Sequence, residues 1–304
     1  MKLQRLALAL AGVGLLASTA TSTAGATSTA PTSTGAVAEI CWNTVVWPTL
    51  SGLVDTVDVT AHKPPTVVGP PYVYSKFFAT RYMDTWYSAW NASLTQNYAF
   101  GLFLQGPNLY RHTTVLSARP PLRPKVVKVG TGWAGFRAIA ASSDPLKGIR
   151  STYLYGLNSN GNLYRYAPNG AGYKAAGSFA GFKSFKTMTV VGEGTMYDTL
   201  LMTTKAGALY TIHIPMSAKP KPVVKLVRKS GWASYESLVV DGCGADGGSI
   251  ITAVDHDTNT GYQYLFTKFK GTATAITSYG KVPASFNGIN HVAVRQYNWG
   301  LLGE

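Results

Sequence analysis

The sequence predicts an all-β protein, on the grounds of its composition, its internal repeats and its lack of helical periodicity. The chain has 304 residues, of which 46% are hydrophobic and only 13% are charged. This balance excludes disorder over most of the length, and a coiled coil would need far more charged residues. Tyr (18), Trp (7) and Phe (11) occur among 32 Gly, a mixture typical of short strands joined by tight turns. No segment shows the apolar stripe of an amphipathic helix.

The amino-terminal residues have the pattern of an export signal. Lys2 and Arg5 precede an uncharged apolar run of 11 residues at 6–16, and small residues follow it. That order predicts a secretory signal peptide at 1–26. Residues 27–40, which are rich in Ala, Thr and Ser, are expected to form a flexible leader. The apolar run is too short to span a bilayer, so we expect a secreted protein with no membrane span.

A repeat of about fifty residues organises the chain after this leader. Four segments share a turn followed by a strand that reaches a tyrosine: Pro107–Tyr110, Gly161–Tyr164, Gly207–Tyr210 and Gly261–Tyr264. A second landmark, usually Gly-Trp or Gly-Phe before another aromatic residue, follows each one: Gly132–Phe136, Gly181–Phe185, Gly231–Tyr235 and Val282–Phe286. The four tyrosines are 54, 46 and 54 residues apart. Each copy has room for about four short strands, with a hairpin before the tyrosine.

A sheet of four short strands cannot bury both of its faces alone, whereas sheets stacked radially around an axis cover one another. Dividing the 264 residues from 41 to 304 by five gives about 53, which matches the observed period. The sequence therefore predicts a single five-bladed β-propeller at 41–304. We place its copies at about 41–95, 96–150, 151–197, 198–248 and 249–304, the first being the faintest.

These motifs and the copy number resemble the tachylectin family of five-bladed propeller lectins. The resemblance is good over about 95–304 and poor over 41–95. It implies a ring of similar pockets that bind N-acetylated amino sugars. Phe182 and Pro283 stand where other copies have Trp133 and Trp232, so we expect one to three working sites.

The candidate sugar-binding residues are the repeated aromatic ones. An aromatic ring can cover the apolar face of a pyranose, and Trp also carries an N–H donor. We select Trp133, Trp232 and Phe182, together with Tyr110, Tyr164 and Tyr210. The alternative is that these rings pack between blades. The aromatic residues Phe136, Phe185, Tyr235 and Phe286, and the leucines Leu109, Leu163 and Leu209, are expected to be core.

The chain shows no clear catalytic or metal-binding motif. Residues 255–261 resemble the start of a calcium loop, but the glycine is displaced and Phe266 stands where a bidentate Glu is needed. We interpret this segment as a hairpin turn. The carboxylates are scattered, and no spacing selects a glycosidase pair such as Asp241 with Asp246 or Asp255 with Asp257. We expect no enzymatic activity, no cofactor and no metal.

The formal net charge of +14 favours anionic partners. Two matching connections are rich in cations: Arg119, Arg123, Lys125 and Lys128, then Lys219, Lys221, Lys225, Arg228 and Lys229. One explanation is protection of exposed edge strands, and the other is attraction to an anionic cell-wall polymer. Nucleic acid is not expected, because the chain is exported and lacks a recognition motif.

The two cysteines, Cys41 and Cys243, are expected to form a disulfide. Cys243 lies where the copy at 198–248 gives way to the last copy, and in a ring of five units the amino terminus lies beside the last unit, so the two cysteines could meet. An oxidising compartment would preserve the bond. Two buried free thiols are the alternative.

The sequence thus predicts a secreted, monomeric lectin for glycans of the N-acetylglucosamine or N-acetylgalactosamine type. A non-catalytic scaffold for protein or cell-wall interaction, and an exported glycan hydrolase, are the alternatives.

Overall fold

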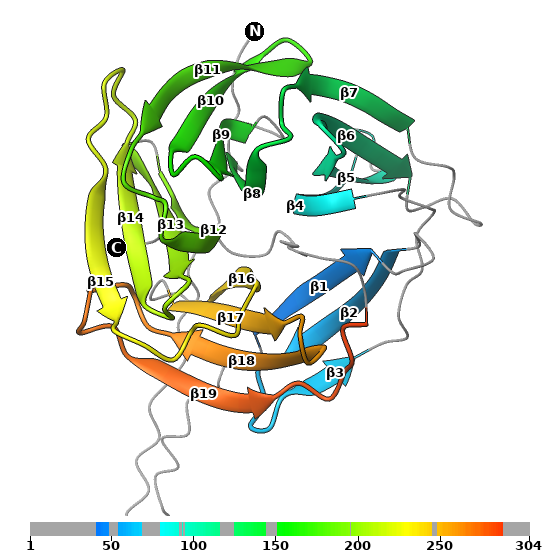
Figure 1. Cartoon of the computed structure of the whole chain (residues 1–304). Coiled ribbons are helices and arrows are strands. Elements are labelled where there is room, and N and C mark those ends of the chain that lie inside the picture. The colour runs from blue at the N-terminus through cyan, green and yellow to red at the C-terminus, as the bar shows by residue number, and fades with distance from the viewer. Residues whose placement is uncertain are drawn as a thin grey trace, which may run out of the picture. The chain divides into compact units, whose positions relative to one another are not determined.

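Five sheets radiate from a common centre, with β1, β4, β8, β12 and β16 innermost (Figure 1). The computed structural model describes residues 41–48, 54–68, 80–90, 93, 95–115, 125–143, 151–194, 196–244 and 248–287. The predicted signal peptide (1–26) and leader (27–40) lie outside the described residues, as do Arg119 and Arg123. None of the described segments is a helix long and apolar enough to cross a bilayer.

The strands follow one another outward from the centre in each sheet, which we call a blade. Blade 1 contains β1 (Trp42–Pro48), β2 (Val54–Thr60) and β3 (Thr66–Val68). Blade 2 contains β4 (Thr80–Trp90), β5 (Asn97–Gln105), β6 (Asn108–Val115) and β7 (Lys125–Thr131). Blade 3 contains β8 (Phe136–Ser143), β9 (Ser151–Asn158), β10 (Leu163–Asn169) and β11 (Gly172–Phe179).

Blade 4 contains β12 (Phe185–Glu193), β13 (Tyr197–Thr204), β14 (Leu209–Pro215) and β15 (Val223–Arg228). Blade 5 contains β16 (Ser237–Cys243), β17 (Gly248–Asp255), β18 (Thr260–Phe266) and β19 (Ile276–Lys281). All paired strands among the described residues are antiparallel. Four of the sheets have four strands and the first has three in its described part. The predicted five-bladed β-propeller is confirmed.

The blades are offset from the sequence copies by one strand. The copy at 151–197 contains β9, β10 and β11 of blade 3 and then β12, the innermost strand of blade 4. The copy at 96–150 likewise holds the outer strands of blade 2 and the innermost strand of blade 3. Each of these copies therefore spans the interface between two neighbouring blades.

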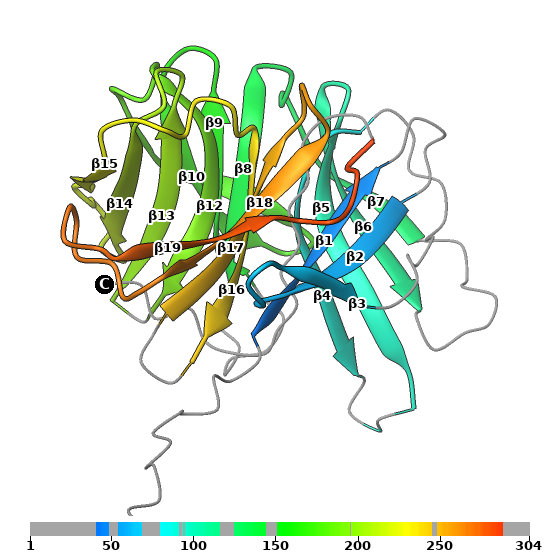
Figure 2. The ribbon, with the colours of Figure 1, turned by 90° about the horizontal axis from the view of Figure 1, so that it is seen from below.

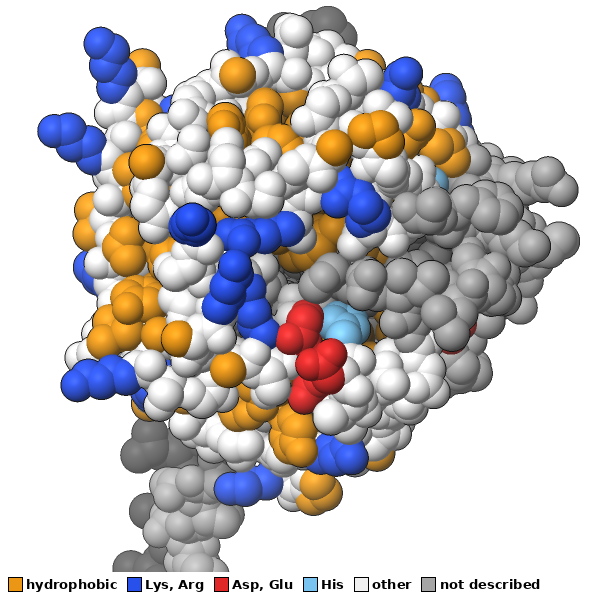
Figure 3. Space-filling model, viewed as in Figure 1, with side chains coloured by type: hydrophobic (Ala, Val, Ile, Leu, Met, Phe, Trp, Pro, Cys, Tyr) orange, Lys and Arg blue, Asp and Glu red, His pale blue; other side chains and the backbone are white. Residues whose placement is uncertain are grey.

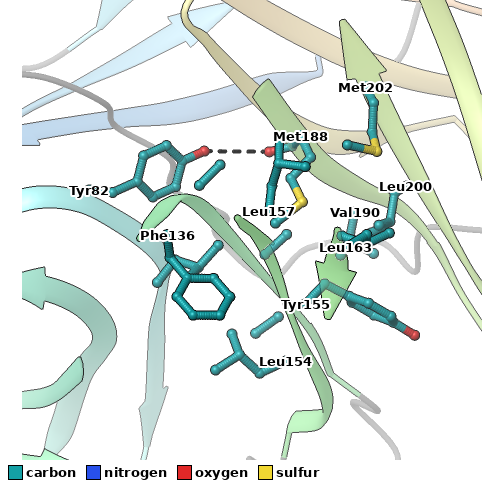
Figure 4. Close-up of a cluster of buried hydrophobic side chains, with 14 of the residues drawn as sticks. Tyr82, Phe136, Leu154, Tyr155, Leu157, Leu163, Met188, Val190, Leu200 and Met202 are labelled. Carbon is teal, nitrogen blue, oxygen red and sulfur yellow. Dashed lines mark hydrogen bonds between the residues drawn. The ribbon is translucent and has the colours of Figure 1, made fainter. Parts of the chain in front are cut away.

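The largest hydrophobic cluster joins blades 2, 3 and 4 (Figure 4). Tyr82 on β4, Tyr155 on β9 and Met188 on β12 belong to it, and the Tyr82 hydroxyl donates a 3.5 Å hydrogen bond to the Met188 carbonyl oxygen. The repeated leucines Leu109, Leu163 and Leu209 are fully buried, as expected. Burial of each such side chain stabilises the fold by roughly 2 kcal/mol.

A disulfide fastens blade 1 to blade 5, as predicted. The sulfur atoms of Cys41 and Cys243 are 2.04 Å apart and their Cα atoms 5.4 Å apart, across 202 positions of sequence. Beside this bond, Asn43 is completely buried and pairs with two strands of blade 5. Its Nδ2 donates to the Val239 carbonyl oxygen at 2.9 Å, and its Oδ1 accepts from Thr252 Oγ1 at 2.9 Å.

A second polar contact between blades 5 and 1 stands where other copies use leucine. Gln263 occupies the position of Leu109, Leu163 and Leu209, and its Nε2 donates to the Val59 carbonyl oxygen at 3.2 Å. The Trp47 and Phe286 rings pack edge to face nearby, with centroids 5.2 Å apart. The first and last blades are therefore joined by a covalent bond, buried amides and apolar packing.

Candidate functional site

One face of the propeller carries hairpin turns and the loops that lead from one blade to the next. We call it the turn face and define it by the hairpin turns 105–108, 158–163, 204–209 and 255–260 and the adjoining blade connections. The turn between β17 and β18 points to the top of Figure 2, and the connection from β15 to β16 runs through the upper half of that view. Figure 3 shows basic side chains beside acidic and histidine side chains near the centre of this face.

An equivalent backbone hydrogen bond joins each connecting loop to the hairpin of the preceding blade. The donors and acceptors are Trp133 N to Pro107 O (2.8 Å), Phe182 N to Gly161 O (2.8 Å), Trp232 N to Gly207 O (3.0 Å) and Val282 N to Gly261 O (2.8 Å). In the last copy the bond comes from Val282, because Pro283 has no backbone N–H to donate. The loops therefore occupy equivalent places on the turn face.

Gly161 shows how closely the turn and loop fit. Its φ of +91° lies in the region that favours glycine, and a Cβ added there would meet the Cβ of Lys183 at 2.9 Å. A larger residue at Gly161 would displace the loop that leads to blade 4.

A basic residue at the start of an innermost strand fixes the next connection. Arg81 donates from Nη1 to the Phe136 carbonyl oxygen and from Nη2 to that of Trp133, both at 2.9 Å. Arg137 donates to the carbonyl oxygen of Phe182 at 3.2 Å. Lys186, at the same place in blade 4, forms a 2.8 Å ion pair with Glu236. These cations have partners in the protein, so they serve the contacts between blades.

The two tryptophans and the phenylalanine selected from the sequence are core residues. Trp133, Trp232 and Phe182 are only 4%, 5% and 4% exposed. The Trp133 ring packs against Tyr166 at 4.9 Å between centroids, and the Trp232 ring packs against Tyr264 at 5.0 Å. Rings enclosed in this way offer no face to a pyranose. We therefore correct the assignment of these three residues to ligand binding and favour the alternative of packing between blades.

The tyrosines of the repeat lie closer to solvent. Tyr164 is half-buried, and Asn160 Nδ2 donates a 3.0 Å hydrogen bond to its hydroxyl oxygen. Hydrogen bonds from the side chains of Asn162 and Asn160 lower the pKa of Tyr164. The turn thus presents a phenol and two amide side chains in direct contact. We call Asn160, Asn162 and Tyr164 the amide–tyrosine cluster.

The same position has different surroundings in the other blades. In blade 2, Asn108 Nδ2 lies 3.4 Å from the Tyr110 hydroxyl. In blade 4, Ala206 and Ala208 replace the two asparagines, while the ring contact is the same: Tyr210 packs edge to face on Phe185 as Tyr164 does on Phe136, both with centroids 5.5 Å apart.

In blade 5 the Tyr264 hydroxyl forms a 2.6 Å hydrogen bond with that of Tyr235, and burial raises the pKa of both. The amide–tyrosine pairing therefore occurs in blades 2 and 3 among the described copies. The sequence interpretation missed these asparagines because they were assigned to turn formation, although their replacement by alanine in blade 4 is visible in the sequence.

The segment that resembles a calcium loop is a hairpin turn. Asp255 Oδ1 accepts hydrogen bonds from the backbone nitrogens of Asp257 (3.0 Å) and Thr258 (3.1 Å), which is the geometry of an Asx turn. His256 Nε2 lies 2.9 Å from Ser237 Oγ, and Ser237 is buried. Within the described ranges, no three His, Cys, Asp or Glu side chains are grouped so as to hold a metal.

No protein-family model matches the chain, and no curated protein sequence gives a significant match. Solved structures of similar topology include AofleA from Arthrobotrys oligospora (10% identity, 84% of this chain and 75% of that one, TM-score 0.46). They also include an Aleuria aurantia lectin in complex with Fucα1-6GlcNAc (12% identity, 82% of this chain and 80% of that one, TM-score 0.39). A third is the catalytic domain of a GH62 α-L-arabinofuranosidase from Coprinopsis cinerea (14% identity, 76% of this chain and 78% of that one, TM-score 0.42).

These likenesses concern the fold alone. All three TM-scores are below 0.5, and both a lectin and a glycoside hydrolase are among the matches, so they do not separate binding from catalysis. The function is therefore argued from the residues of the turn face.

Proposed function

We propose that the protein is a secreted, monomeric lectin that binds N-acetylated amino sugars on its turn face and does not catalyse a reaction. The observation that carries this proposal is the amide–tyrosine cluster of blade 3, where Asn160 donates to the Tyr164 hydroxyl at 3.0 Å. The similar pair Asn108 and Tyr110 in blade 2 provides a second place for the same ligand.

The chemistry of the cluster suits a sugar that carries an acetamido group. Each asparagine side chain supplies two N–H donors and a carbonyl acceptor, and the tyrosine hydroxyl supplies one of each. An acetamido group needs both kinds of partner, while the ring of Tyr164 provides apolar surface for its methyl group or for the C–H face of the pyranose. The cluster carries no charge, which favours a neutral ligand.

Secretion is supported by the basic residues and apolar run at the amino terminus and by the disulfide. Disulfides persist in oxidising compartments and are rare in the cytosol. The bond between Cys41 and Cys243 is therefore consistent with export.

A glycan array with the purified protein tests the proposal. The array should include N-acetylglucosamine, N-acetylgalactosamine, their deacetylated forms and fucose. We expect binding to the acetylated sugars, with a Kd near 1 mM for a single site and tighter apparent binding where two sites act together. Asn160→Ala with Asn162→Ala should weaken binding about thirtyfold, since each of the two lost hydrogen bonds to a neutral group contributes about 1 kcal/mol.

The matched control is Tyr210→Phe, compared with Tyr164→Phe. Both remove one hydroxyl from the same register position, but Tyr210 is flanked by Ala206 and Ala208 instead of asparagines. Only Tyr164→Phe should reduce binding. Equal effects of the two changes, or no binding to any glycan, would contradict the proposal and favour a protein-interaction scaffold. Release of free sugar from a bound oligosaccharide would instead identify a hydrolase.

A further inference from the structure

The outer rim of blades 4 and 5 carries six exposed lysines. They lie in the segment 217–230 and in the loop 267–275, and we call them the lysine rim: Lys219, Lys221, Lys225, Lys229, Lys268 and Lys270. The sequence contains no Asp or Glu between Asp198 and Glu236, or between Asp257 and Glu304. Neither segment therefore contains an acidic residue of its own.

The two segments lie against each other. Arg228, at the end of β15, donates from Nη2 to the Thr274 carbonyl oxygen at 2.7 Å and from Nη1 to that of Thr272 at 3.4 Å. A Cβ added to Gly271 would lie 3.5 Å from the Leu226 carbonyl oxygen. Figure 1 shows the connection between β18 and β19 passing the end of β15. The two lysine-bearing segments are therefore in contact at the end of β15.

The loop that carries Lys268 and Lys270 is held by internal bonds. Thr274 is buried; its Oγ1 accepts from Lys270 N at 2.8 Å and donates to the Gly271 carbonyl oxygen at 2.7 Å. Phe269, between the two lysines, is buried against Phe266 with ring centroids 5.6 Å apart. Because the backbone is fixed, the lysines are presented from a defined framework and lose less freedom on binding.

Protection of the sheet edge accounts for only part of this charge. Lys225 lies on β15, the outermost strand of blade 4, where a lysine hinders pairing with another strand. Lys219 and Lys221 precede that strand, and Lys268 and Lys270 lie in a loop. These positions have no free strand edge to protect.

We propose that the lysine rim binds a linear phosphodiester polymer that lacks bases, of the poly(glycerol phosphate) type. The cations are lysines, whose compact ammonium groups bind phosphate oxygens as point charges. Val223 and Val224, 47% and 49% exposed, provide apolar contact for the carbon backbone of such a polymer.

Nucleic acid is disfavoured, since proteins that bind single strands stack the bases on aromatic side chains. No aromatic residue occurs at 217–230, and Phe269 is buried. The lysine rim shares no residue with the amide–tyrosine cluster, and this inference does not rest on the proposed glycan site.

The test is the binding of poly(glycerol phosphate) to the full chain, measured by fluorescence anisotropy over a series of salt concentrations. The rim variant combines Lys219→Ser, Lys221→Ser, Lys225→Ser and Lys229→Ser. The matched control combines Lys63→Ser, Lys174→Ser, Lys183→Ser and Lys205→Ser, which removes the same charge from exposed lysines outside the rim and outside the matching connection of blade 2. Heparin and single-stranded DNA serve as competing polyanions.

We expect the rim variant to bind at least about tenfold more weakly, with the slope of log K against log salt reduced by ~3. The control should change affinity less than about threefold. Equal losses in the two variants would overturn the proposal, because net charge alone would then explain binding. Tighter binding of DNA or heparin than of poly(glycerol phosphate) would also overturn it, in favour of those ligands.

Discussion

The hydroxyl of Tyr155 on β9 donates a 2.7 Å hydrogen bond to Oδ2 of Asp198 on β13, inside the interface between blades 3 and 4. Both side chains are fully or almost fully buried. Burial raises the pKa of Asp198 to about 7, while hydrogen bonds from Tyr155 and Ser142 oppose that rise. A carboxyl group is therefore kept in the core with a pKa far above its ordinary value.

Stability should fall as pH rises from about 4 to about 7. Across this range the folded state holds the Asp198 proton more tightly than the unfolded state, so raising the pH favours unfolding. Asp198→Asn keeps an acceptor for Tyr155 and should remove this decrease. Tyr155→Phe removes a bond that lowers the pKa, and should extend the decrease to higher pH. Urea unfolding at several pH values measures both effects, and parallel curves for the three proteins would exclude Asp198 as the cause.

Removing the disulfide should destabilise the propeller more than any single contact at the same interface. A loop of 202 residues between Cys41 and Cys243 corresponds to an upper value of ~5 kcal/mol in the chain-entropy model. We expect the doubly substituted protein, Cys41→Ser with Cys243→Ser, to unfold at a clearly lower temperature. Addition of reductant to the unsubstituted protein should have the same effect. An unchanged Tm under both conditions would show that Asn43, Gln263 and the apolar contacts suffice.

Trp133→Ala and Trp232→Ala should each reduce stability by roughly 3–5 kcal/mol, because both rings fill the core between a loop and a strand. Trp133→Phe should cost less, since blade 4 already uses Phe182 at this place. Calorimetry measures the change directly. A folded Trp133→Ala protein with unchanged Tm would return this ring to the candidate sugar-binding residues.

Arg165 should not be replaceable by lysine. Its guanidinium is almost completely buried and donates to the carbonyl oxygens of Pro215 (3.1 Å), Ala176 (3.3 Å) and Ser217 (3.0 Å). A lysine lacks the planar fork that reaches three acceptors in both adjoining blades. We expect Arg165→Lys to destabilise the protein by about 2–4 kcal/mol.

Arg111 provides the control, because it occupies the same place after the repeat tyrosine in blade 2 and is only partly buried. Arg111→Lys should change the free energy of unfolding by less than about 1 kcal/mol. If both substitutions gave the same effect, the three carbonyl acceptors of Arg165 would not be the reason for its importance.

The sequence allowed prediction of the fold and of the disulfide because both depend on period and copy number. The regular spacing of the Gly-x-Leu-Tyr segments requires similar sheets, and circular order alone places Cys41 beside Cys243. The direction in which a repeated aromatic ring points could not be predicted from period and copy number. Whether Trp133 faces solvent depends on Tyr166, which lies on another strand of the following blade, and no local pattern reports that contact.

The burial of polar residues inside the blade interfaces could not be predicted from the sequence pattern either. Arg165 stands between two tyrosines in a strand, where alternation alone would direct a charged side chain to solvent. Its burial follows from carbonyl groups supplied by blade 4, at positions about fifty residues later in the chain. The offset between copies and blades has the same origin, since sequence similarity does not reveal which strand completes which sheet.

That one-strand offset bears on how such a chain can be lengthened or shortened by recombination. A duplicated copy contains the three outer strands of one blade and the innermost strand of the next. The inserted piece therefore completes the sheet before it and begins the sheet after it. Loss of a whole copy likewise leaves each surviving sheet with its full set of strands. Changes in blade number can therefore occur at the gene level without an intermediate that exposes an unfinished sheet.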